Sequence, residues 1–196
     1  MEAFSDGVFA IAITLLVLEI SVPEDALENL WRGIADQWPS YLAYVTSFLT
    51  IGGLWIVHHG IFRRLRHATL ALVRLNLVLL MVVSFLPFPT RLVADAIDAT
   101  SAERAAVIFY GATLFAISFM ITLIARYVAR RGDLLHDSVD LAEVRAAAAR
   151  VSPNLVFYAL VLLFALVAPL VAAFGFFALS LTAVIPRRLE RLGRPA

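Results

Sequence analysis

Apolar residues gather in six long runs that are separated by short polar segments. The runs cover roughly residues 4–20, 40–62, 70–89, 104–128, 152–170 and 172–186. A helix of about 20 apolar residues is long enough to cross the hydrocarbon core of a membrane. The pattern therefore predicts an all-α, polytopic membrane protein, with residues 1–196 forming one domain of six transmembrane helices.

The last two runs are short, and their separation needs a second argument. Pro169 and Gly175 interrupt an apolar stretch over 154–185 that would otherwise suit one long buried helix. Arg150 precedes this stretch and Arg187 follows it. Because arginines mark the cytoplasmic side of a membrane protein, both ends are expected on that side, and the stretch must cross twice.

Arginine clusters follow the second, fourth and sixth runs and set the expected orientation. The clusters are Arg63, Arg64 and Arg66, then Arg126, Arg130 and Arg131, then Arg187, Arg188, Arg191 and Arg194. Carboxylates fill the first two loops on the opposite side, at Glu24, Asp25, Glu28, Asp36, Asp95, Asp98 and Glu103. The positive-inside rule then predicts that both termini are cytoplasmic.

Between the fourth and fifth runs lies a polar segment that can still be helical. Asp140 and Glu143 have the spacing of a capping box at a helix N-terminus. We expect a separate short helix there, on the cytoplasmic side or at the interface. Pro87 and Pro89 are expected to end the third transmembrane helix.

Composition supports the membrane class and excludes several functions. Apolar residues make up 62% of the chain, against about 45–50% in soluble domains. The sequence has no cysteine, which excludes disulfides, thiolate metal sites and cysteine nucleophiles. No nucleophile–base pair or metalloprotease motif suggests an enzyme, and no basic tail suggests nucleic-acid binding.

The first apolar run carries the most informative polar residues, which are Ser5, Asp6 and Thr14. On a helix with 100° per residue, one stripe contains Phe4, Gly7, Ile11, Thr14 and Leu18. Asp6 lies about 140° away from Ile11 on the same wheel. Glu19 closes the run and is expected to face water.

Two interpretations of this stripe are open from the residues alone. It can be an ordinary contact between helices. Alternatively, Ile11 and Leu18 from several subunits can form a hydrophobic constriction that gates by dewetting. In that case Thr14 offers hydroxyl oxygens that replace part of the hydration shell of an ion.

The segment from Phe4-Ser5-Asp6 to Ile20 resembles the signature of the transmembrane protein 175 family of potassium-selective channels. The resemblance implies six spans in each subunit, a homotetramer, and a pore lined by the first helix without a Thr-Val-Gly-Tyr-Gly filter loop. It places the constriction at Ile11, with Thr14 and Leu18 further along; we add the neighbouring Leu15 to this pore-lining set. The family pattern also has an arginine four residues before the phenylalanine, a position that this sequence does not include.

Further polar residues resemble the partners of the Phe-Ser-Asp motif in that family. They are Trp55, His58 and His59 on the second span and Asn76 on the third. We interpret them, with Ser5 and Asp6, as a structural network that positions the first helix, in which Asp6 pairs with a histidine and with Asn76. Metal or haem ligation by the histidines and proton sensing are the alternatives.

The sequence therefore predicts a passive, potassium-selective channel in the cell (plasma) membrane. Its expected partners are copies of itself, the lipid bilayer and permeating potassium ions, with no cofactor or bound metal. The alternative is a proton-coupled secondary transporter that uses Asp6 and the histidines as a relay. The internal symmetry and paired broken helices of transporters are missing from the sequence.

Overall fold

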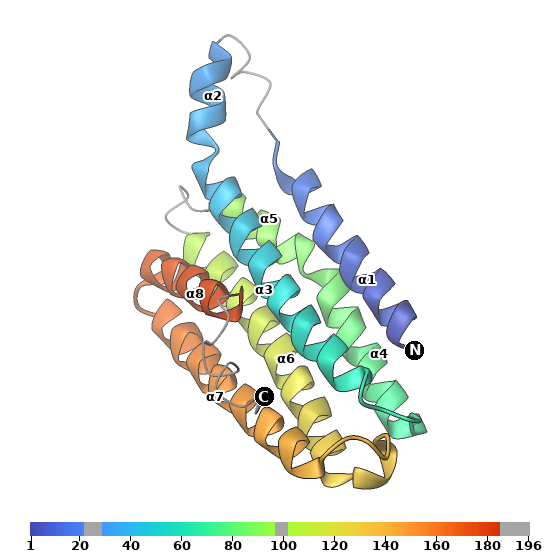
Figure 1. Ribbon diagram of the computed structural model, residues 1–196. Coiled ribbons are helices and arrows are strands. Elements are labelled where there is room, and N and C mark those ends of the chain that lie inside the picture. Colours follow the sequence, from blue (N-terminus) through green and yellow to red (C-terminus); the bar gives the residue numbers. More distant parts are fainter. Residues whose placement is uncertain (22–28, 97–101, 185–196) are drawn as a thin grey trace, which may run out of the picture.

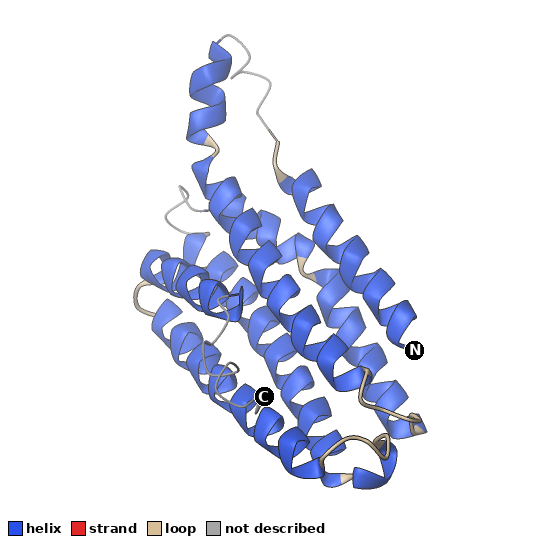
Figure 2. Ribbon diagram, in the orientation of Figure 1, coloured by secondary structure: helices blue, strands red, loops and turns tan. Residues whose placement is uncertain are grey.

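The computed structural model describes residues 1–21, 29–96 and 102–184, and helices make up almost all of these segments (Figure 2). Their bounds are α1 (Glu2–Leu15), η1 (Leu16–Glu19), α2 (Leu30–Asp36), α3 (Trp38–Phe62), α4 (Leu70–Phe85), α5 (Pro87–Ala96), α6 (Glu103–Arg130), η3 (Gly132–Leu134), α7 (Leu141–Ala165) and α8 (Pro169–Val184). The prediction of an all-α chain is confirmed for this part of the protein.

Helix α6 forms the core of the bundle. Its side chains at Leu114, Ile117, Ile121 and Ile124 are essentially inaccessible to solvent. It packs against α4 and α5 on one side and against α7 and α8 on another. Helix α1 instead lies along the edge of the bundle, where it contacts α3 and α4 (Figure 1).

Four helical segments are long and apolar enough to cross a membrane. They are Trp38–Phe62, Leu70–Ala96, Glu103–Arg130 and Leu141–Ala165. Helix α8 contributes a shorter apolar segment, Pro169–Thr182, and α1 has 14 residues. The multi-pass membrane class is thus confirmed.

Three helices differ from the bounds that the sequence pattern predicts. The first run does not continue as an α-helix to Ile20, because α1 ends at Leu15 and tightens into the 3₁₀ turn η1. Helix α4 ends at Phe85, just before Pro87, as predicted, but the span does not end there: α5 begins at Pro87, whose missing N–H and fixed φ suit a first helical turn. The short helix predicted after Asp140 is not separate from the fifth span, because α7 runs unbroken from Leu141 through Pro153.

The expected cap of that helix is present. The Asp140 side chain accepts a hydrogen bond from the Ala142 N–H at 2.8 Å. Pro153 removes one hydrogen bond from the interior of α7 but leaves the helix continuous. The predicted turn before Pro169 lies at residues 166–167, directly after α7, whereas Gly175 lies inside α8 and does not interrupt it.

The loop between α3 and α4 and the loop between α6 and α7 are joined by backbone hydrogen bonds. The Arg66 N–H donates to the Leu134 carbonyl at 2.9 Å, and the His136 N–H donates to the Arg64 carbonyl at 3.1 Å. Beside them the hydroxyls of Thr69 and Tyr127 are 2.9 Å apart. These bonds fix the start of α4 to the end of α6. The carboxylates at Glu24, Asp25, Glu28 and Asp98 and the arginines beyond residue 186 lie outside the described residues.

Candidate pore helix and its polar anchor

One face of α1 has no partner within the described part of the chain. Phe4, Ile11 and Leu18 are 61%, 60% and 70% exposed. Gly7 and Thr14 on the same face are exposed as well. This is the stripe that the helical wheel singles out, and Leu15 beside it is 40% exposed.

The opposite face of α1 is anchored in the bundle. Phe9, Ala12 and Leu16 are at most 1% exposed and belong to the main hydrophobic core. The contrast between the two faces follows from their spacing of three and four residues. A helix of this kind presents an apolar stripe outward while its other side fixes its position.

Thr14 is the polar residue on the exposed face, and its hydroxyl proton is already used. The side chain donates a hydrogen bond to the Ile11 carbonyl at 2.9 Å. A threonine hydroxyl that donates back to its own helix still has two lone pairs with which it can accept. The oxygen is therefore suited to accept a hydrogen bond or to coordinate a cation.

A buried chain of hydrogen bonds joins three helices behind α1. The Asn76 Nδ2 on α4 donates to Ser5 Oγ on α1 at 2.9 Å. The other end of the amide, Asn76 Oδ1, lies 2.8 Å from His58 Nε2 on α3. Since Oδ1 can only accept, His58 donates from Nε2. All three side chains are at most 1% exposed.

Aromatic rings enclose the buried histidine. The His58 ring stacks on Phe62 with centroids 4.1 Å apart, and Phe9 from α1 lies 5.2 Å away. Among the described residues, His58 Nδ1 has no hydrogen-bond partner. This chain ties α1 to α3 and α4 at one depth and includes no carboxylate.

Asp6 belongs to a second, half-exposed group. Its Oδ1 accepts a hydrogen bond from Trp55 Nε1 at 2.8 Å, and its Oδ2 lies 3.5 Å from His59 Nδ1. The prediction that Asp6 also pairs with Asn76 is wrong. Asp6 and Ser5 are adjacent on a helix, so their side chains diverge by about 100°, and only Ser5 reaches α4.

Two partners were not found by sequence reasoning. Glu2 Oε1 lies 3.3 Å from His59 Nδ1, so this histidine faces two carboxylates from α1. Their spacing of four residues was the available signal. Glu19 does not simply face water: its Oε2 lies 3.7 Å from Arg91 Nη1 on α5, a pairing between distant segments that no local pattern reveals.

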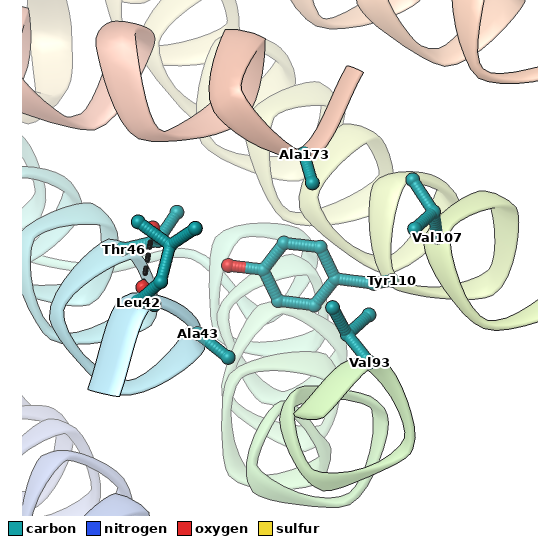
Figure 3. Close-up of a pocket in the computed structure, with 7 residues that line it drawn as sticks. All are labelled: Leu42, Ala43, Thr46, Val93, Val107, Tyr110 and Ala173. Atoms are coloured by element: carbon teal, nitrogen blue, oxygen red, sulfur yellow. Dashed lines mark hydrogen bonds between the residues drawn. The ribbon is translucent and has the colours of Figure 1, made fainter. Parts of the chain in front are cut away.

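A separate polar contact holds the core of the bundle together. Ser47 Oγ lies 2.8 Å from Thr90 Oγ1 and 2.9 Å from the Tyr110 hydroxyl, which joins α3, α5 and α6. Figure 3 shows Tyr110 reaching across a small cavity toward α3. The cavity is lined by Leu42, Ala43, Thr46, Val93, Val107, Tyr110 and Ala173. These residues are mostly apolar, and they lie apart from the exposed face of α1.

The fold defines a helical, multi-pass membrane protein, and comparison with known proteins gives its class and family. The model of the endosomal/lysosomal potassium channel TMEM175 family matches residues 1–87. A protein named as a potassium channel from Streptomyces collinus is 42% identical over 91% of this chain and 88% of its own length. The chain belongs to the TMEM175 family, which comprises ion channels and not enzymes.

Two further relatives agree. A protein named as a potassium channel from Chamaesiphon minutus is 43% identical over 74% of this chain and 73% of its own. The crystal structure of a lysosomal potassium-selective channel TMEM175 homologue from Chamaesiphon minutus superposes with a TM-score of 0.82. It covers 93% of both chains at 34% identity. The family resemblance carried by the first run is thereby confirmed.

Proposed function

We propose that the protein is a potassium-selective channel in the cell (plasma) membrane, with both termini cytoplasmic. Four copies, each with six membrane helices, surround a pore lined by α1. Ile11, Thr14, Leu15 and Leu18 face the permeating ions. Ions move passively, and no cofactor takes part.

The observation that carries this proposal is the unpartnered face of α1. Its bulky apolar side chains are at least 40% exposed although the same helix buries Phe9 and Ala12. A single copy of such a stripe cannot enclose a path for ions. A closed ring of identical subunits buries it and places four copies of Ile11 around one axis.

The chemistry of this stripe suits potassium. A ring of isoleucines forms a hydrophobic constriction that a hydrated ion crosses only with loss of water. Potassium gives up its hydration shell at lower cost than sodium because its charge density is lower. The exposed Thr14 oxygens, whose protons are bound to the Ile11 carbonyl, keep lone pairs that offset part of that loss.

The transporter alternative gains no support from the polar groups. A proton relay needs a chain of titratable groups that leads through the protein. The buried chain of Ser5, Asn76 and His58 ends without a carboxylate. Asp6 and His59 lie only at the N-terminal end of α1.

The direct experiment is ion flux through purified protein in liposomes with opposed potassium and sodium gradients. A current that reverses near the potassium potential supports the proposal. Saturable turnover that requires a proton gradient would contradict it. The replacement Phe157→Leu, at an exposed position on α7, is the control for expression and reconstitution, and its flux should equal that of the unmodified protein.

Replacing Thr14 with alanine will weaken potassium selectivity more than replacing Leu18 with alanine. Only Thr14 offers an oxygen to a partly dehydrated ion. Reversal potentials in mixed potassium and sodium gradients measure the effect, and Thr14→Ser, which keeps the hydroxyl, is the matched control. Identical reversal potentials for Thr14→Ala and the unmodified protein would mean that Thr14 does not contribute to potassium selectivity.

Replacing Asp6 with alanine will lower the stability of the assembly and leave selectivity unchanged. The carboxylate bonds to Trp55 and lies away from the exposed face of α1. We expect a loss of roughly 1.5–3 kcal/mol, the usual range for a hydrogen bond to a charged group. Thermal melting and reversal potentials measure the two effects separately. A stable Asp6→Ala tetramer with collapsed selectivity would place Asp6 in the ion path.

A further inference from the structure

Arg74 is a charged residue on the exposed face of a membrane helix. It lies one turn inside α4, and the same face carries Leu70, Leu77 and Met81, which are at least 50% exposed. None of the ion pairs among the described residues includes it. An arginine in a membrane helix is costly unless it reaches water, a headgroup or a counter-charge.

The depth of Arg74 matches that of two carboxylates on α1. Helices α1 and α4 run in the same direction, since Ser5 bonds Asn76 near their starts and Glu19 meets Arg91 further along. With about 1.5 Å of rise per residue, Arg74 lies roughly 3 Å before the level of Ser5. On the same scale Glu2 lies roughly 4.5 Å before that level and Asp6 roughly 1.5 Å beyond it.

The two carboxylates, Glu2 and Asp6, form a cluster with His59, so the cluster contains more acidic than basic groups. Ligand atoms of Glu2, Asp6 and His59 all lie within 4.8 Å of one another. The cluster is half-exposed, with Glu2 at 40% and His59 at 30% side-chain exposure. It lies between α1 and α3, whereas Arg74 lies on the outward face of α4.

A ring of subunits brings these two faces together. Within each subunit α1 is flanked by α3 and α4. In the proposed ring α1 faces the central axis, and this arrangement sets the outward face of α4 in one subunit against the outward face of α3 in the next, a head-to-tail contact that closes by rotation. The face of α3 beside α1 is also apolar and open, with Phe48 and Ile56 exposed by 39% and 54%.

We propose that Arg74 of each subunit binds the Glu2 and Asp6 carboxylates of the neighbouring subunit. The pair completes a site that one copy cannot form, and it rests on the ring arrangement under Proposed function. A guanidinium offers several N–H donors in one plane, which suits two carboxylates on successive turns of a helix. Each subunit gives one arginine and receives one, so the contact repeats around the ring.

Cysteine cross-linking tests the contact directly, because the chain contains no cysteine of its own. The double variant Glu2→Cys with Arg74→Cys, oxidised in the membrane, is expected to give dimer, trimer and tetramer bands on a denaturing gel. Each single variant gives dimers at most. The matched control, Glu2→Cys with Leu160→Cys on the exposed side of α7, is expected to give no tetramer band. Only monomer from the Glu2–Arg74 pair would overturn the proposal.

Charge reversal tests the energetic role of the pair. We expect Arg74→Glu to lower the tetramer fraction in mild detergent by about tenfold or more, and Arg74→Glu with Glu2→Arg to recover most of it. If Arg74→Glu and Arg74→Gln both assemble as the unmodified protein does, Arg74 reaches lipid headgroups instead and the proposal fails.

Measurements on the unmodified protein distinguish a failure of the Arg74 contact from a failure of the proposed channel. Should it form tetramers and conduct potassium while the cross-link is absent, only the Arg74 contact is wrong. Should it be monomeric and inactive in liposomes, the proposed channel itself is wrong.

Discussion

Replacing Ile11 with asparagine will increase potassium flux, by about tenfold or more, and will reduce discrimination against sodium. In the proposed pore, four isoleucine side chains form the narrowest ring and expel water from it. An amide in the same position holds water and lets ions pass with part of their hydration shell. A tenfold rise corresponds to a barrier lowered by about 1.4 kcal/mol.

The matched control is Ile11→Leu, because leucine has the shape of asparagine without its polar atoms. Leucine keeps the ring dry, so the flux of Ile11→Leu should stay close to that of the unmodified protein. Flux and reversal potential in liposomes measure both variants at equal protein content. If Ile11→Asn assembles normally and conducts as before, the constriction lies elsewhere on α1.

The sequence grouped the residues of one stripe on the first helix because a helix has one simple period. A stripe at spacings of three and four identifies Phe4, Ile11 and Leu18 whatever packs behind them, and these are the residues that the structure leaves exposed. The same period does not reveal where η1 begins. A change from α to 3₁₀ geometry after Leu15 depends on packing at the end of the helix, where Leu16 is fully buried.

Contacts between distant segments were predicted only in part. Ser5, Asp6, Trp55, His58, His59 and Asn76 do lie together, but they separate into two groups. Which neighbour each side chain meets depends on the rotation of α3 and α4 about their axes, and local sequence does not set that rotation. The continuity of α7 through Pro153 has a similar origin, since the packing of α7 against α6 outweighs the loss of one backbone hydrogen bond.

Replacing Asn76 with leucine will destabilise the assembly, because the Asn76 amide bonds both other members of the buried chain that anchors α1. Leucine fills a similar volume but offers no hydrogen bond, so the His58 Nε2–H loses its acceptor inside the protein. Ser5 Oγ also loses a donor, although it still donates to the Met1 carbonyl at 3.2 Å. A buried group left without a partner costs roughly 1–3 kcal/mol.

A double-mutant cycle isolates the network from the loss of packing. In Asn76→Leu with His58→Phe, neither partner is polar, and an aromatic ring remains to stack on Phe62. The two changes should therefore be less costly together than the sum of the single variants, by roughly 1–3 kcal/mol. Melting of the purified assembly followed by size-exclusion chromatography gives the four values that the cycle requires.

The same four proteins show whether the buried chain positions the pore helix. In Asn76→Leu, α1 loses its bond to α4 through Ser5, so the alignment of Ile11 around the axis should loosen and the potassium preference should fall. His58→Phe keeps the Asn76–Ser5 bond and should retain that preference even where its melting temperature drops. Equal selectivity in both variants, with strictly additive melting shifts, would mean that the chain fills space without positioning α1.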